Sequence, residues 1–174
     1  MEVSWLDLLT LSTALVGAVL GVFNTVHGYL QTKVRLRVTP KALLHVDGGV
    51  ISTTSANVPP EMNNVGIEVV NLSGFAVTVN EVGVLFRGET RRGVLVAPRL
   101  TDPHQKRTLP IRLQPRESFT CFAEPMQMAR TLLKGNVYAA FAETDCGYRE
   151  KATSPAFKEI CRRVHAAFGT REGL

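Results

Sequence analysis

The residues that could carry chemistry are few and scattered along this chain. No P-loop, GxGxxG, HExxH, GxSxG or CxxC pattern occurs. The segment 102–104 (Asp-Pro-His) could supply metal ligands or an acid–base pair, but a polar loop explains it. Glu143 and Asp145 lie two residues apart, as carboxylates often do beside a turn. We therefore expect no enzymatic activity, no metal site and no cofactor. The histidines and cysteines show no ligand spacing; they are His27, His45, His104, His165, Cys121, Cys146 and Cys161.

The three cysteines indicate a compartment rather than a reaction. An odd, sparse set of cysteines is typical of a reducing environment, where disulfides do not persist. Cys121 sits between Thr120 and Phe122 in a segment typical of a strand, and we interpret it as a small core residue. Cys146 falls in a predicted turn and is the most exposed candidate thiol, although no activating base is near it in the sequence.

Basic residues gather in the middle third of the chain. The chain has a net charge of +5 and an isoelectric point near 9.4, which suits an anionic neighbour. Such a patch could contact nucleic-acid phosphates, but no aromatic residues that would stack on bases accompany it. We favour a solvated basic face near an anionic bilayer and keep nucleic-acid binding as a second alternative. The patch comprises Arg91, Arg92, Arg99, Lys106 and Arg107.

The element expected to position everything else is an uncharged run, residues 8–32. A helix of that length, at about 1.5 Å per residue, exceeds the roughly 30 Å hydrocarbon core of a bilayer. The acidic start of the chain argues against a cleaved signal peptide. Basic residues follow the run, so we expect the N-terminus outside and the rest of the chain in the cytoplasm. The predicted membrane-interface residues are Trp5, Tyr29, Lys33, Arg35 and Arg37.

A stripe of small and polar residues lies along this helix. Gly17 and Gly21 form a GxxxG spacing, and Asn24 and Gly28 continue the stripe. Small residues allow membrane helices to approach closely, and an asparagine can form a hydrogen bond across the contact. We therefore predict a helix contact that could form a homo-oligomer or bind another membrane protein. Glycine is also simply frequent in membrane helices, and the helix could instead be buried between subunits of a virion or similar assembly.

The remaining residues predict a mainly β domain. Seven to nine short strands separated by turns, with one interior helix at 125–134, favour an antiparallel sandwich. We expect Pro40 to close the first strand, with residues 43–46 as an alternative continuation of it. We expect Phe75 to share a face with Val77 and Val79. In the interior helix we expect Met126, Ala129, Leu132 and Leu133 to be buried. The expected strands cover 34–39, 66–71, 75–79, 82–86, 93–97, 109–113, 118–123, 137–142 and 149–153.

Loops and termini complete the predicted organisation. Residues 47–64 and 98–108 read as loops, with room for a short strand in the first. Ser154 should cap a C-terminal helix that Pro155 begins. We therefore divide the chain into an anchor helix (1–33), a sandwich domain (34–154) and an amphipathic helix with a tail (155–174).

Two stretches carry a resemblance: residues 67–79 (IEVVNLSGFAVTV) and 109–118 (LPIRLQPRES). They resemble uncharacterised bacterial and phage proteins that have an N-terminal membrane helix, a basic stop and an immunoglobulin-like sandwich. In that group a V-x-N-x-G-x-x-P-V-T-V strand precedes an LP-x-x-L-x-P-G-E turn and a D-x-x-G-x-x-Y hairpin. Here Ala76 replaces the first pattern's proline, Arg116 replaces the glycine, and the hairpin is shortened to 145–148. The resemblance implies the fold and the anchoring, and it offers no activity.

The favoured hypothesis is a single-pass, membrane-anchored interaction or structural module in the cytoplasmic membrane. The first expected partner is the lipid bilayer. The second is another copy of this chain, another membrane protein or a virion protein. A virion or assembly component is the alternative.

Overall fold

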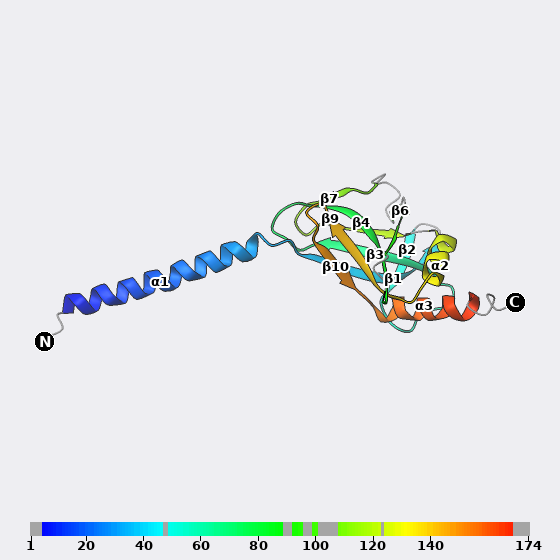
Figure 1. Ribbon diagram of the computed structural model, residues 1–174, viewed down its shortest axis with the longest axis horizontal. Coiled ribbons are helices and arrows are strands. Elements are labelled where there is room, and N and C mark those ends of the chain that lie inside the picture. The colour runs from blue at the N-terminus through cyan, green and yellow to red at the C-terminus, as the bar shows by residue number, and fades with distance from the viewer. Residues whose placement is uncertain are drawn as a thin grey trace. The chain divides into compact units, whose positions relative to one another are not determined.

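The structure is a computed structural model (Figure 1) that describes residues 5–46, 49–88, 92–95, 99–100, 108–122 and 124–168. The chain divides into two compact units, residues 1–33 and 34–174. The described part is mainly β, with an apolar helix near the N-terminus, two antiparallel sheets and a C-terminal helix.

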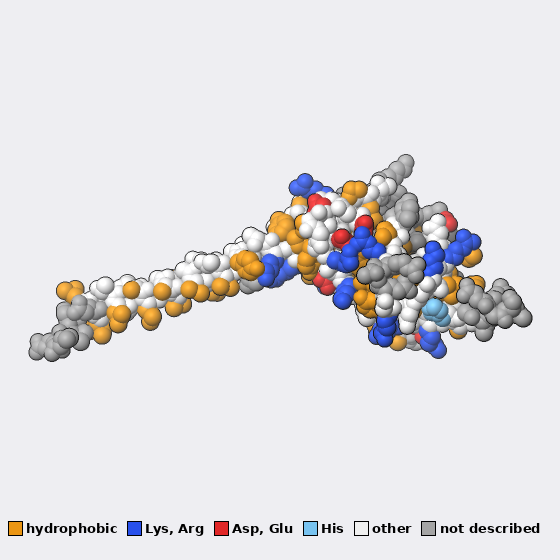
Figure 2. Space-filling view, in the orientation of Figure 1, with side chains coloured by type: hydrophobic (Ala, Val, Ile, Leu, Met, Phe, Trp, Pro, Cys, Tyr) orange, Lys and Arg blue, Asp and Glu red, His pale blue; other side chains and the backbone are white. Residues whose placement is uncertain are grey.

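The first unit consists of helix α1, Trp5–Gln31. Its segment Leu8–Tyr29 has a mean hydropathy of 1.7, and none of it is buried. Figure 2 shows hydrophobic side chains along the visible face of this helix. Several hydroxyl groups donate to carbonyl oxygens one turn earlier, as Thr10 Oγ1 does to Leu6 O (2.8 Å) and Thr25 Oγ1 to Gly21 O (2.8 Å). These bonds reduce the cost of placing hydroxyl groups in an apolar medium.

The first sheet of the second unit has the strand order β2-β1-β3-β8-β6, and all of its pairs are antiparallel. The alternation of apolar and polar residues places one face of each long strand in the core. In β3, for example, Val65, Ile67 and Val69 are fully buried. The bounds are β1 Leu36–Val46, β2 Gly49–Thr53, β3 Asn64–Asn71, β6 Arg99–Leu100 and β8 Ser118–Phe122.

The second sheet has the order β10-β9-β4-β5, with β7 also paired to β4, and it too is antiparallel. The antiparallel order predicted from the scarcity of crossover helices is therefore confirmed. The bounds are β4 Val77–Phe86, β5 Arg92–Val94, β7 Ile111–Leu113, β9 Val137–Thr144 and β10 Arg149–Ala152.

Both sheets and two helices contribute to one hydrophobic core. Helix α2, Pro125–Leu133, buries Met128 and Leu132, and helix α3, Pro155–Phe168, buries Phe157 and Ile160. The two helices lie side by side (Figure 1) and contact each other. Ser154 Oγ accepts a hydrogen bond from the Phe157 amide at 3.1 Å, which confirms the predicted N-cap. The core therefore includes α3 together with the sheets.

Several predictions about local structure are wrong, each because of a tertiary contact. The first strand does not end at Pro40: β1 continues to Val46 and pairs with β3 from Leu36 to Leu43. Proline has no backbone N–H to donate to a neighbouring strand. Pro40 is tolerated because β2 pairs with β1 only from Ala42 onward, so no hydrogen bond to β2 is lost at Pro40. Residues 75–79 and 82–86 are not two strands, because β4 runs through both with a bulge at Asn80.

The predicted burial is also wrong at two positions. Phe75 precedes β4 and is 37% exposed, and Met126 in α2 is 61% exposed. In α2 the buried positions are Met128 and Leu132, one turn apart. Most of segment 98–108 lies outside the described residues, but Arg99–Leu100 in it form β6, which pairs with β8.

Candidate functional site

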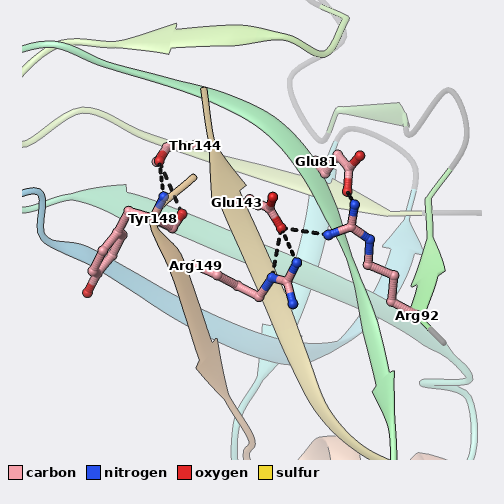
Figure 3. Close-up of polar contacts among 6 residues, drawn as sticks. All are labelled: Glu81, Arg92, Glu143, Thr144, Tyr148 and Arg149. Atoms are coloured by element: carbon pink, nitrogen blue, oxygen red, sulfur yellow. Dashed lines mark hydrogen bonds and ion pairs between the residues drawn. The ribbon is translucent and has the colours of Figure 1, made fainter. Parts of the chain in front are cut away.

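The outer face of the second sheet carries a cluster of four charged residues, Glu81, Arg92, Glu143 and Arg149 (Figure 3). Glu81 and Glu143 lie opposite each other on β4 and β9, so their carboxylates would repel. Arg92 of β5 lies between them, with NH2 2.9 Å from Glu81 Oε2 and NH1 2.7 Å from Glu143 Oε2. Arg149 of β10 reaches the same Glu143 oxygen, with Nε at 2.7 Å. The cluster thus joins four neighbouring strands and is electrically balanced.

An aromatic side chain lies beneath these arginines. Phe141 is fully buried although it points away from the shared core. The guanidinium carbons of Arg92 and Arg149 lie 5.8 and 5.4 Å from its ring centre, within cation–π range. Opposite Phe141, β4 has Gly83, where a Cβ would lie 2.9 Å from the ring and 2.1 Å from Gly93 O. Only glycine fits the ring and strand β5 at this distance.

The chemistry open to this cluster is electrostatic. Hydrogen bonding from Arg149, together with the charges of Arg149 and Arg92, lowers the pKa of Glu143. The carboxylate therefore stays ionised near neutral pH, whereas a general acid would need a raised pKa. Glu143 acts in this arrangement as a fixed negative charge that orients two arginines.

A second organised region lies where the chain enters the sheet domain. We name it the junction end; it comprises Arg35 and the loops 71–76, 114–117 and 145–148. Antiparallel register brings these segments to one end of the sheets, since Leu36 pairs with Asn71, Val77 with Leu113, and Val79 with Thr144. The hydrogen bond from Tyr148 to Glu150 raises the pKa of Tyr148, and the positive charge of Arg35 reduces this rise.

Asn71 is the centre of the junction end, and it is fully buried. Its Nδ2 lies 2.8, 3.1 and 3.2 Å from the carbonyl oxygens of Phe75, Leu113 and Gln114. Its Oδ1 accepts a hydrogen bond from the Ser73 amide at 2.9 Å. Every polar atom of the side chain is therefore engaged, and the ends of both sheets are joined through it.

Ser73 links this centre to the incoming chain. Its Oγ accepts a hydrogen bond from the Arg35 amide at 2.8 Å and lies 3.3 Å from Arg35 O. Arg35 O also accepts from the Leu72 amide at 2.8 Å. Hydrogen bonds to the loop 71–76 therefore hold the backbone of Arg35, close to the start of the second unit.

The predicted residues of α1 lie as follows. No atom lies within 4 Å of a Cβ built on Gly17, Gly21 or Gly28, so this stripe is open for contact. The side-chain amide of Asn24 forms no hydrogen bond with a described residue. Trp5 and Tyr29 are exposed near the two ends of the helix, and Lys33 Nζ lies 4.6 Å from the Tyr29 ring centre. Arg35 and Arg37 are exposed in the second unit.

The predicted basic patch is only partly described. Arg92 is held by two carboxylates, which leaves less positive charge for a phosphate. Arg99 is in β6, but its side chain lies outside the described part of the structure. The other three predicted residues lie wholly outside it; they are Arg91, Lys106 and Arg107. Among the described residues, no three His, Cys, Asp or Glu side chains are grouped to hold a metal.

The cysteines are all unpaired. Burial raises the pKa of Cys121 to about 12, and that of Cys161 likewise to about 12, so both thiols stay protonated. Cys121 is buried, as predicted, and Cys146 is exposed, as predicted. Cys146 Sγ lies 3.1 Å from Thr144 Oγ1 at the junction end.

The charge cluster and the exposed loop residues of the junction end were not identified from the sequence. Glu81, Arg92 and Glu143 come from three strands far apart in the chain, and no local pattern indicates their contact. The one available signal was the hairpin 145–148, which places Arg149 opposite Glu143.

No protein-family model, curated protein or solved structure matches this chain.

Proposed function

We propose that this protein is a non-enzymatic, single-pass, membrane-anchored interaction or structural module. One observation carries the proposal. Leu8–Tyr29 is long and apolar enough to cross a membrane, and none of it is buried. The second unit has its own hydrophobic core. An exposed apolar surface of this size in water would aggregate, whereas a bilayer covers it.

The orientation is part of the proposal. Lys33, Arg35 and Arg37 follow the helix directly, and this basic excess supports a cytoplasmic sheet domain. The unpaired cysteines agree with a reducing compartment. We further propose that the domain is an immunoglobulin-like sandwich, supported by two antiparallel sheets around one core and by the resemblance of residues 67–79 and 109–118.

Membrane attachment is tested by expressing the full chain in bacterial cells and extracting the membranes with alkaline carbonate. The protein should stay with the membrane at its full mass. Loss of the first 30 or so residues would show a cleaved signal sequence and contradict the anchor. Soluble oligomers formed without detergent would instead support an assembly in which α1 is buried between subunits.

Orientation is tested with the exposed thiol of Cys146. A maleimide that cannot cross the membrane should label Cys146 only after the cells are lysed. The matched control adds a cysteine at the N-terminus in a Cys146→Ser background, which intact cells should expose to the reagent. Labelling of Cys146 in intact cells would reverse the proposed orientation.

A further inference from the structure

A short stretch of chain joins the end of α1 to the junction end. The helix ends at Gln31, and the backbone of Arg35 is already bonded to Leu72 and Ser73. The four residues 32–35 span at most about 14 Å when fully extended. If Tyr29 and Lys33 lie at the membrane surface, the backbone of Arg35 lies within that reach of it.

Two apolar side chains are exposed at this end. Leu72 is 46% exposed and Phe75 is 37% exposed, on either side of buried Ser73. Their backbone is held in place, because the Leu72 amide donates to Arg35 O and Phe75 O accepts from Asn71 Nδ2. These hydrogen bonds fix the backbone on both sides of Ser73, where the two apolar side chains are exposed.

Basic residues flank these side chains. Arg35 is exposed beside Leu72, and Arg116 is exposed in the 114–117 turn, where its amide donates to Asn71 O. Arg116 adopts a φ of 65°, a conformation that favours glycine and costs an arginine roughly 1 kcal/mol. The acidic residues of the same loops are Glu117, which accepts from the Gln114 amide at 2.7 Å, and Asp145. The junction end thus has two basic and two acidic residues, and both arginines are exposed.

We propose that Arg35, Leu72, Phe75 and Arg116 form a lipid-contact surface that binds the anionic headgroups of the bilayer crossed by α1. Leu72 and Phe75 enter the boundary between headgroups and acyl chains, and the arginines pair with lipid phosphates. The surface fixes the sheet domain against the membrane and directs its opposite end, with α2 and α3, toward the cytoplasm. This inference depends on the proposed anchoring.

The test uses the full chain in phosphatidylcholine vesicles with or without phosphatidylglycerol. A single environment-sensitive probe is attached to Phe75→Cys in a Cys146→Ser background, since Cys121 and Cys161 are buried. The matched control carries the probe on Asn136→Cys, an exposed position just before β9 and thus at the other end of that strand from Thr144. Lipids that carry a nitroxide near the headgroup quench any probe that reaches them.

The Phe75 probe should be quenched by the nitroxide lipids, more strongly with phosphatidylglycerol, and the Asn136 probe should not. Each of the substitutions Arg35→Gln and Arg116→Gln should lower the equilibrium ratio of quenched to unquenched Phe75 probe about five-fold. Equal quenching of both probes, or a Phe75 probe that only aqueous iodide quenches, overturns the proposal. A shielded Phe75 probe that lipids do not quench also overturns it, and indicates a protein partner.

The outcome separates this inference from the proposed function. A protein that floats with the vesicles and resists carbonate, but whose Phe75 probe is unquenched, keeps its anchor and loses the lipid-contact surface. A protein that does not float with the vesicles contradicts both.

Discussion

The side-chain nitrogen of Asn71 lies 3.1 Å from the carbonyl oxygen of Leu113, and this contact joins the end of β3 in one sheet to the end of β7 in the other. The same nitrogen is shared with two more carbonyl oxygens, those of Phe75 and Gln114. The side-chain nitrogen of Asn71 thus faces three carbonyl oxygens in a fully buried site. No other side chain of the same shape could donate hydrogen bonds to them.

Asn71→Asp should therefore destabilise the sheet domain by about 3 kcal/mol, because it places a carboxylate oxygen against three carbonyl oxygens and buries a charge. Urea unfolding in mild detergent, followed by tyrosine fluorescence, measures the change. Asn80→Asp, at an exposed position of β4, is the control and should cost little. A similar loss in both variants would show that Asn71 is not the centre of the junction end.

Gly83→Ala should destabilise the domain by about 2 kcal/mol or more, because the added Cβ would lie 2.1 Å from the backbone oxygen of Gly93. Strand β5 would have to move and would weaken the contact of Arg92 with Glu143. Gly49→Ala in β2, where nothing lies within 4 Å of the new Cβ, should be close to neutral. Thermal unfolding of both variants gives the comparison, and equal midpoints would contradict the close approach of β4 and β5.

Arg116→Gly should stabilise the 114–117 turn by about 0.5 kcal/mol. Relief of the left-handed backbone outweighs the greater freedom of glycine in the unfolded chain. Arg116→Ala removes the same charge but keeps a Cβ, so it should give no such gain. A gain in both variants would assign the effect to charge instead of backbone conformation. Urea midpoints distinguish the two results.

The stability of the domain should decrease in acid partly through Glu159. Hydrogen bonds from Arg162 and then Arg163 lower the pKa of Glu159 from 4.5 to about 2. Because the folded pKa lies below the unfolded one, the stabilisation is complete above pH 4.5 and is lost as the pH falls toward 2. Glu143, whose pKa is also lowered, contributes in the same direction.

Glu159→Gln should therefore lower the unfolding midpoint at neutral pH and reduce its dependence on pH below 4.5. Thermal unfolding across that range measures the slope. Glu61→Gln, at an exposed loop position, is the control and should leave the slope unchanged. Parallel curves for Glu159→Gln and the unmodified chain would exclude this linkage.

Gly17→Leu and Gly21→Leu should weaken association of α1 with a second copy, because larger side chains keep the helix backbones apart. Asn24→Leu should weaken it by about 1 kcal/mol through loss of an interhelical hydrogen bond. Energy transfer between labelled chains, diluted into vesicles, measures association. Ala18→Leu, a small-to-large change off the stripe, is the control. Association that none of the three stripe substitutions alters would show that the stripe is not the contact.

Features that depend on neighbouring residues were readable from the sequence. The uncharged run predicted the apolar helix, and the two-residue alternation predicted most strands. Ser154 and Pro155 predicted the start of α3, and the 114–117 turn is closed by a hydrogen bond from Glu117 N to Gln114 O. Each of these depends on hydrogen bonds or burial patterns within a few residues, so local order is enough to predict them.

Pro40, Phe75 and Met126 show where local order was not enough. Pro40 remains inside β1 because of where β2 begins, and Phe75 is exposed because the Asn71 network holds its loop outward. Met126 has the apolar character of a core residue, but the packing of α2 buries Met128 instead. In each case the deciding partner is distant in the sequence.

The sequence by itself determined the class of each segment: one apolar helix followed by antiparallel strands and short helices. Only the tertiary structure placed Arg92 between Glu81 and Glu143, and brought Leu72, Phe75 and Arg116 to the end where Arg35 enters the domain. Helix propensity and strand alternation act over a few residues, whereas strand register joins residues that lie far apart in the chain. The surfaces available for binding follow from that register.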